Sequence, residues 1–374
     1  MVQQASLCRH TEESFTLEKT PDTASAPPGN SSAARARNRQ VRLRSPRFYL
    51  MVSFVLYGMI LAVITLANAI GPDRWWLSGL NLYLPQWLWG LPGLLLTVAT
   101  FKIAWRAAWF PLLCLLWVAG PLMGFCWGTS LSADAAAGKP ALRVMTYNIK
   151  YGRGDINAII DEITNAQPDL LMIQDAAETM RGPLGIFLKS WNVRTFGQYI
   201  IASKLPLSRA EVRWISFPGA PHTCLRCRLT ISSRSVTVYD VHLLTPRQGL
   251  SAIKSEGDDG VSTLEDNITA RLYQAKVLAE MLQKEQGPLI AAGDLNAPDS
   301  SIVCKMLAQA GLHDAFSEAG QGYGYTYGHA LRLRHSFMRI DHLLLSPDWR
   351  AQHCRTGGSE GSAHRPVIAD LILQ

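Results

Sequence analysis

Residues able to bind a metal or transfer a proton stand where several apolar runs of this sequence end. The run LIAAGDLNAPDSS passes from apolar residues to Asp294 and Asn296, two positions apart. Asn148, Asp175 and His242 end other apolar runs in the same way. Ligands bind at strand ends, because the middle of a buried strand is apolar and inaccessible. The pattern therefore predicts one site to which several strands contribute.

Two further residues complete a set of seven. Asp341 lies in the apolar run FMRIDHLLLSP, and His364 lies in the loop before the last apolar run. Carboxylate and amide oxygens suit Mg²⁺ or Mn²⁺, and a His held by an Asp can act as a general base. Together with a second His, this is the equipment for attacking a phosphoester with water. A single Asn at a strand end is usually a turn former, but seven such residues favour a catalytic site.

The elements that must position these residues read as alternating strands and helices, which is typical of an α/β domain. GDINAIIDEITNAQP has apolar residues at the spacing of one helical face, and NITARLYQAKVLAEMLQKE predicts a second helix. DLLMIQDAAE is a near-continuous apolar run, as expected of a strand buried on both faces. CLRCRLTISSRSVTVYDVHL predicts a strand, a turn and a strand.

Cys224 and Cys227, with His222 close by, have the spacing of a redox or zinc pair. On a strand, however, positions three apart face opposite sides. No second pair in the sequence completes a four-ligand zinc set. We therefore expect both cysteines to be structural.

Three apolar runs precede this domain. FYLMVSFVLYGMILAVITLANAI (48–70) and AWFPLLCLLWVAGPLMGFCWG (108–128) have the roughly 20 residues that a membrane-spanning helix needs. LPQWLWGLPGLLLTVATF (84–101) is shorter and interrupted by two prolines, which predicts a third span or a re-entrant hairpin. Tryptophans cluster at the predicted ends of the runs, as they do at membrane interfaces.

The sequence thus divides into a basic leader (1–47), a membrane region with about three helices (48–128), a linker (129–141) and a globular domain (142–374). The leader is rich in Ser, Ala, Pro and Arg, which is typical of disorder, and its positive charge favours the cytoplasm. Three spans would then place the domain outside the cytoplasm, in the periplasm of a bacterial cell. If the middle run does not cross, this orientation is reversed.

The net charge of +7 is concentrated near the membrane region. Eight Lys/Arg and four Asp/Glu give residues 1–47 a charge of +4, and residues 71–106 carry +2. Only +1 is left for residues 129–374. The globular part therefore lacks the basic excess that binding to a nucleic-acid backbone usually leaves.

Residues 142–374 resemble the endonuclease/exonuclease/phosphatase superfamily, which includes nucleases, neutral sphingomyelinases and inositol polyphosphate phosphatases. The matching stretches follow the order of the family: VMTYNIKYG, LMIQDAAE, VYDVHLL, LIAAGDLNAP, RIDHLLLSP and GSAHRPVIADL. The resemblance implies a four-layer α/β sandwich, in which two mixed sheets pack together and helices cover their outer faces.

The resemblance also implies a role for each polar strand end. Asn148 and Asp175 would hold the divalent metal, Mg²⁺ or Mn²⁺. Asp294 would orient or help to activate the attacking water, and Asn296 would support the phosphate. His242 would stabilise the phosphoryl oxygens.

Asp341 would support His364, which would be the base. Two departures from the family pattern stand beside this assignment. The family has Glu where this chain has Asp175, which is one methylene shorter. The family sequence Ser-Asp-His is here Ser362-Ala363-His364, so one carboxylate that helps to hold metal is missing.

The segment after His242 is expected to be a loop of about 25 residues, flanked by Arg247 and Arg271. It is either a substrate lid, with these arginines binding phosphate, or a plain surface loop. The sequence lacks the Trp-Cys-Asp-Arg signature of inositol phosphatases. Three functions remain open: a membrane-anchored phosphodiesterase or phosphatase acting on a lipid or small phosphoester, a nuclease with the same site, or a binding domain without catalysis. The bilayer is the expected partner, and the sequence indicates no protein partner.

Overall fold

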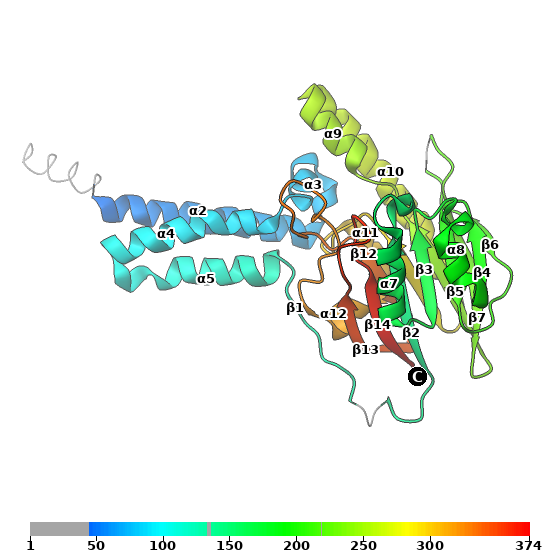
Figure 1. Ribbon diagram of the computed structural model, residues 1–374. Coiled ribbons are helices and arrows are strands. Elements are labelled where there is room, and N and C mark those ends of the chain that lie inside the picture. Colours follow the sequence, from blue (N-terminus) through cyan, green and yellow to red (C-terminus); the bar gives the residue numbers. More distant parts are fainter. Residues whose placement is uncertain (1–44, 133–135, 218) are drawn as a thin grey trace, which may run out of the picture. The chain divides into compact units, whose positions relative to one another are not determined.

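The computed structural model describes residues 45–132, 136–217 and 219–374, and Figure 1 shows the order of their elements. The disorder predicted for the leader concerns residues that lie almost entirely outside this description. Residues 50–374 form one structural unit.

The first large sheet in the described chain has six strands in the order β13-β14-β2-β3-β5-β4. Only β2 and β3 are parallel, and the other neighbours are antiparallel. The sheet is therefore mixed, as expected. Its strands are β2 (Ala141–Asn148), β3 (Leu170–Gln174), β4 (Asn192–Phe196), β5 (Tyr199–Ser203), β13 (Trp349–Thr356) and β14 (Val367–Leu373).

The second large sheet has the order β10-β12-β9-β8-β7-β6, and only β8 and β9 are parallel. Its strands are β6 (Glu211–Trp214), β7 (Thr223–Ile231), β8 (Arg234–His242), β9 (Leu289–Asp294), β10 (His313–Asp314) and β12 (Asp341–Leu345). The predicted strand–turn–strand is β7–β8, and Ser232 and Ser233 take the positive φ of a two-residue hairpin turn. A small pair, β1 (Cys126–Trp127) and β11 (Gln321–Gly322), lies outside both sheets.

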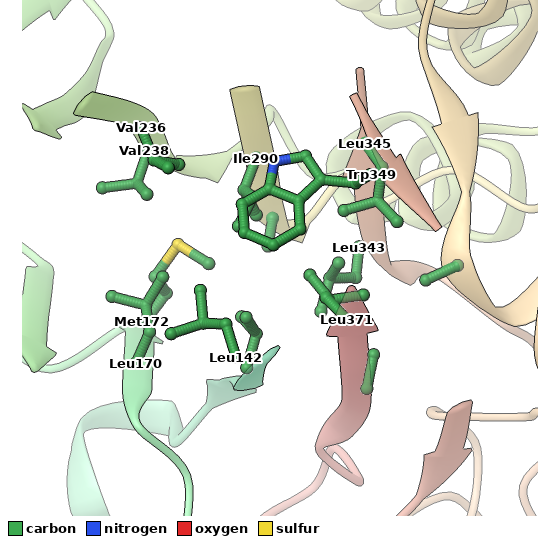
Figure 2. Packing of buried hydrophobic residues seen from close by; sticks show 14 of the residues in the cluster. Leu142, Leu170, Met172, Val236, Val238, Ile290, Leu343, Leu345, Trp349 and Leu371 are labelled. Atoms are coloured by element: carbon green, nitrogen blue, oxygen red, sulfur yellow. The ribbon is translucent and has the colours of Figure 1, made fainter. Parts of the chain in front are cut away.

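The two sheets pack face to face over an apolar core (Figure 2). Leu142, Leu170 and Met172 from the first sheet meet Val238 and Ile290 from the second. Helices cover the outer faces: α7 (Ile156–Ala166) and α8 (Pro183–Phe187) on the first sheet, α10 (Asp259–Leu282) and α11 (Ile302–Gln309) on the second. The predicted four-layer α/β sandwich is confirmed.

Local chemistry explains why the predicted helix after β2 forms where it does. The side chain of Asp155 accepts hydrogen bonds from the backbone N–H groups of Asn157 and Ala158, which caps the start of α7. Ile159 and Ile163 are buried against the first sheet, as their spacing predicts.

Cys224 and Cys227 lie on opposite faces of β7, as predicted. Cys224 packs under the helices that cover the second sheet, whereas Cys227 packs between the sheets. Burial raises the pKa of the Cys224 thiol to about 12 and that of Cys227 to about 11. Both thiols are therefore protonated at neutral pH, which fits a structural role.

The segment after His242 is not the loop that its Gly, Ser and Asp content predicts. It folds into α9 (Arg247–Glu256), and α10 begins at Asp259, well before the predicted start. Leu264 of α10 is fully buried, and Gly260 approaches the backbone of Ala252 so closely that no side chain fits there. Packing between the two helices therefore overrides the turn-forming composition.

The N-terminal apolar runs form helices. Two of them, Pro46–Ile70 (α2) and Trp105–Leu122, are long and apolar enough to cross a membrane, which is weak evidence for membrane anchoring. The second of these contains α5 (Trp109–Trp117). The third run forms α4 (Gly90–Ile103), whose 14 residues are fewer than a span usually needs. Between α2 and α4 lies the short helix α3 (Trp76–Leu82), and α12 (Ala315–Ala319) follows β10.

Candidate active site

The sheet topology gathers the polar strand ends at one edge. Asn148 and Asp175 leave the same edge of the first sheet, because β2 and β3 are parallel. His242 and Asp294 leave one edge of the second sheet for the same reason. β12 runs antiparallel to β9, so that its first residue, Asp341, pairs with Asp294.

Hydrogen bonds join the two sheets at this edge. The Asn148 side-chain amide donates to Asp294 Oδ2 at 2.9 Å. Ser362 donates its hydroxyl to the Asn148 carbonyl at 2.7 Å and accepts from the backbone N–H of His364 at 3.3 Å. The loop before β14 is thereby fixed to the end of β2, which places His364 among the strand ends.

Asp341 and His364 form a buried dyad. His364 Nδ1 lies 2.9 Å from Asp341 Oδ2, and its Nε2 lies 3.7 Å from Asp294 Oδ2. Burial disfavours the charged imidazolium, but Asp341 and Asp294 outweigh it and raise the pKa of His364 above its usual value. The ring of Tyr327 packs on the imidazole with 4.8 Å between centroids. Nε2 is therefore the nitrogen available for proton transfer.

His242 lies between two carboxylates. Its Nδ1 is 3.5 Å from Asp175 Oδ1, and its Nε2 is 3.6 Å from Asp294 Oδ2. Gln198 Oε1 lies 2.7 Å from Nδ1 and so accepts the proton of that nitrogen. The imidazole is held in one orientation, with Nε2 facing the centre of the site.

Asp175 follows β3 in the left-handed region, at φ 50°. Lys150 Nζ lies 3.1 Å from its carboxylate. Burial acts to raise the pKa of Asp175, but His242 and Lys150 more than compensate, so that the pKa falls below its usual value. The carboxylate is ionised at neutral pH and already has a cationic partner.

The donor set fits a hard divalent cation. Ligand atoms of Asp294, Asp341 and His364 lie within 4.8 Å of one another, and Asp341 Oδ1 is buried with no hydrogen-bond partner among the described residues. The predicted ligands Asn148 and Asp175 lie at the same edge but outside this group. Buried carboxylate and amide oxygens are the donors that Mg²⁺ and Mn²⁺ prefer.

Asn296 turns the chain behind Asp294. It has a φ of 51°, and its backbone N–H donates to Asp294 Oδ1 at 2.8 Å. Its side chain donates to the Leu243 carbonyl at 2.9 Å, and only 7% of the residue is exposed. Asn296 therefore fixes the Asp294 carboxylate, and its own amide nitrogen already has a protein partner.

Arg271 lies in the interior, which corrects the expectation that it contacts substrate. Its exposure is 1%, and its guanidinium donates to the carbonyls of Asn296 (2.7 Å) and Leu244 (3.1 Å). The sequence placed it beside a loop, but the helix α10 carries it under the site. Arg247 is exposed, with its guanidinium 3.5 Å from the Tyr327 hydroxyl.

A segment between the apolar helices supports the same backbone, and sequence reasoning missed it. The Tyr83 hydroxyl donates to the Asn296 carbonyl at 3.1 Å. Asp73 is buried, accepts from the Ser301 hydroxyl at 2.7 Å, and lies 3.9 Å from Arg271. An Asp in a short loop between apolar runs was the available signal, but nothing in the sequence says which distant surface the loop covers.

Three other contacts were also missed: Lys150 on Asp175, Gln198 on His242 and Tyr327 on His364. Lys150 follows the end of β2 by two residues, so its proximity to the site could have been read from the sequence. Gln198 and Tyr327 lie in loops whose position depends on tertiary packing.

A family model described as the endonuclease/exonuclease/phosphatase family matches residues 145–364, which include all seven polar strand-end residues. No curated protein matches the chain.

Solved structures share the fold. A member of this family from Bacteroides vulgatus is 14% identical, covers 63% of this chain and 100% of its own, and has a TM-score of 0.50. A second, from Bacteroides thetaiotaomicron, is 14% identical with 63% and 99% coverage and the same TM-score. A mannosyl-6-phosphatase from the latter organism is 15% identical, with 62% and 100% coverage and a TM-score of 0.48. At 14% identity, the likeness to the two structures with a TM-score of 0.50 shows the fold alone, whereas the family model covers more than half of the chain. The chain therefore belongs to the endonuclease/exonuclease/phosphatase family, a family of divalent-metal-dependent phosphoester hydrolases.

Proposed function

We propose that this protein is a membrane-anchored phosphoesterase that hydrolyses its substrate by in-line attack of an activated water. The observation that carries the proposal is the buried dyad of Asp341 and His364, 2.9 Å apart, with its free Nε2 3.7 Å from Asp294. A general base needs an orienting carboxylate on one nitrogen and an open second nitrogen. The geometry of His364 supports both conditions.

The side chains divide the reaction between them. His364 Nε2 accepts the proton of the attacking water, and Asp341 stabilises the imidazolium that results. Asp294, held by Asn148 and Asn296, orients the water towards the phosphorus. His242, whose Nδ1 proton is held by Gln198, faces the site with Nε2 and, as the imidazolium, donates from Nε2 to a phosphoryl oxygen, where negative charge develops in the transition state.

A divalent cation, Mg²⁺ or Mn²⁺, fits this proposal. Asp175 and Asn148 would hold it, as the family resemblance implies, and Asp341 Oδ1, which has no hydrogen-bond partner among the described residues, would be a further oxygen ligand. When bound, such an ion supplies neutralisation of the phosphate oxygens and of the leaving oxygen. Lys150 would leave the Asp175 carboxylate for this, and its ammonium would then be free to meet the substrate anion.

The departures at Asp175 and Ala363 weaken metal binding but leave the proton-transfer groups in place. Asp175 is ionised and directed at the site, and His364 keeps its dyad although its neighbour is Ala363. We therefore favour a hydrolase with modest metal affinity over a binding domain without catalysis.

We also propose that the membrane region crosses the bilayer three times and places the catalytic domain outside the cytoplasm. Support comes from the basic leader before α2 and from α4, an apolar helix that packs beside the two longer ones. A single cysteine introduced at the exposed position Leu333 would test this. We expect a membrane-impermeant maleimide to label Leu333→Cys in intact cells. Labelling only after permeabilisation would reverse the orientation.

The activity is tested with the full-length protein in detergent or lipid nanodiscs. Hydrolysis of bis-p-nitrophenyl phosphate, a phosphodiester lipid and supercoiled plasmid is compared with Mg²⁺, with Mn²⁺ and with EDTA. We expect metal-dependent hydrolysis of the small or lipid phosphoester. Preferential, salt-sensitive nicking of the plasmid would favour a nuclease instead. If the folded protein turns over none of the three, a binding domain without catalysis replaces the proposal.

A further inference from the structure

A cavity of about 270 Å³ lies beside the proposed dyad. His364, Asn296 and Lys150 line its catalytic side. The rest of the lining comes from Tyr83, which directly follows α3, from α9 and the two residues before it, and from the segment 327–340. The cavity therefore connects the reacting groups with parts of the chain that the reaction itself does not use.

One wall of this cavity is apolar. Tyr83, Phe337, Met338 and Ile340 line it and belong to one buried cluster. Leu250 of α9 packs against that cluster. Binding against such a wall is favourable for a ligand that buries apolar surface on it. The wall has few groups that could hydrogen-bond to a sugar or a base.

The other side of the cavity is cationic. Arg247 and Lys254 line it from α9, where they are seven positions apart and so share one face of the helix. Lys150 adds a third cation at the catalytic end, and no Asp or Glu is among the described residues that line the cavity. Arg247 lies 3.5 Å from the Tyr327 hydroxyl, and the Tyr327 ring packs on His364, so a cation of α9 reaches the residue that covers the proposed base.

We propose that this cavity binds the apolar group of an amphiphilic phosphoester whose phosphate lies at His364 and Asn296. The inference rests on the proposed function and names its substrate class: a phosphate ester of a long apolar alcohol or acylglycerol type. Arg247 and Lys254 would hold the phosphate end, and Leu250 with its neighbours would hold the first part of the chain. A volume of about 270 Å³ has room for the first part of such a chain.

Nucleic acid fits this cavity poorly. A nucleic acid presents a series of phosphates, which calls for an extended basic track. The globular part carries a net charge of only +1, and the three cations are gathered around a single apolar pocket. The lining residue Tyr83 also belongs to the segment that leads to the apolar helices, so the pocket is contiguous with the membrane region.

The test compares alkyl phosphates that share one phosphate and differ only in chain length, from methyl to octyl. The full-length protein is used with Mg²⁺, and kcat/KM is measured for each ester. We expect kcat/KM to rise at least tenfold from methyl to octyl. The variants Leu250→Gln and Leu331→Gln, both in the lining, should lower this preference several-fold. Leu333→Gln is the matched control, because Leu333 is similarly exposed but lies outside the lining.

Two results would overturn the inference while leaving the proposed function intact: equal kcat/KM for all chain lengths, or an equal loss of preference in Leu333→Gln.

A parallel measurement separates the claim about the pocket from the claim about hydrolysis. Binding of methyl- and octylphosphonate to His364→Ala is measured by calorimetry and does not need turnover. Tighter binding of octylphosphonate without hydrolysis by the wild type would keep the pocket and reject the hydrolase. Phosphatidic acid in nanodiscs, compared with soluble octyl phosphate, shows whether the chain is taken from a bilayer or from solution.

Discussion

At the scale of single residues, the site depends on how each titratable group is paired. His364 is paired with Asp341, His242 with Gln198, and Asp175 with Lys150. Each partner fixes an orientation or a charge state, and each can be removed without touching the reacting atom. Substitution of a partner residue therefore tests its positioning role apart from the chemical step.

Replacing Asp341 by Asn should change the pH dependence of hydrolysis. His364 accepts a proton only when neutral, and its raised pKa means that activity is lost as the pH falls through that value. Asp341→Asn removes the first of the charges that raise it, so the acidic limb of kcat/KM should move to lower pH. The rate at the optimum should fall by about 10²–10⁴-fold, the usual contribution of general base catalysis. An unchanged acidic limb in a pH–rate profile would show that His364 is not the titrating base.

Replacing Ala363 by Asp should tighten metal binding. The residue lies between Ser362 and His364, which are fixed to the end of β2, and it is partly exposed, so there is room for a carboxylate. We expect the affinity for Mn²⁺ to rise about 10-fold or more, by the size of known effects of residues around metal sites. Calorimetry on the full-length protein measures this. Ala363→Asn adds the same volume without charge and should leave the affinity near that of the wild type; an equal gain in both variants would contradict an electrostatic origin.

At the scale of elements, the short segment between the apolar helices is part of the catalytic architecture. Asp73 and Tyr83 contact Arg271 and Asn296, so the chain behind Asp294 is supported from outside the family domain. A domain that began at residue 129 would leave Arg271 without its carboxylate and would expose the Tyr83 side of the pocket.

Asp73→Ala should therefore destabilise the protein and reduce its activity together. Asp73 has 2% exposure and holds the Ser301 hydroxyl and the Ile302 N–H at 2.7 Å each. Removing one partner of a buried charged pair costs about 3–5 kcal/mol. Denaturant unfolding of the full-length protein measures the loss. Asp258→Ala, at an exposed position before α10, serves as control; equal stability of the two variants would show that the segment does not support the domain.

A second buried network, formed by Asp314, Arg339 and His342, makes the free energy of unfolding depend on pH. Burial opposes ionisation of Asp314, but Arg339 and His342 lower its pKa strongly, and the pKa of His342 is raised. The contribution of Asp314 is present above its unfolded pKa of about 3.8 and is lost as the pH falls below it. The stabilising contribution of His342 is complete below its unfolded pKa of about 6.5. It is lost as the pH rises through the raised pKa that His342 has in the folded protein.

Asp314→Asn should therefore lower the free energy of unfolding by about 3–5 kcal/mol near neutral pH, because Arg339 is left buried with one partner fewer. The difference from the wild type should shrink below pH 4, where Asp314 of the unfolded wild type becomes protonated. Chemical denaturation at several pH values measures both. A difference that does not change with pH would point to lost packing rather than lost charge.

At the scale of the whole molecule, the seven polar strand ends could be predicted from the apolar runs, and the four-layer sandwich from the resemblance of the matching stretches to the family. Strand-end residues are visible as the termination of apolar runs, and parallel pairing brings them to one edge. The folding of α9 and α10, the burial of Arg271 and the support from Tyr83 could not be predicted. These depend on which distant segments pack together, and neither periodicity nor composition carries that information.

The central claim is that water attacks the phosphoester with His364 as base, and isotope transfer tests it most directly. The full-length protein would hydrolyse a phosphoester in H₂¹⁸O with Mg²⁺, with His364→Ala and the exposed-site variant His353→Ala for comparison. We predict one ¹⁸O in each phosphate-containing product, a loss of about 10²–10⁴-fold in rate for His364→Ala, and no loss for His353→Ala. Hydrolysis that is equally fast in His364→Ala, or that leaves ¹⁸O in the alcohol product, would contradict the account.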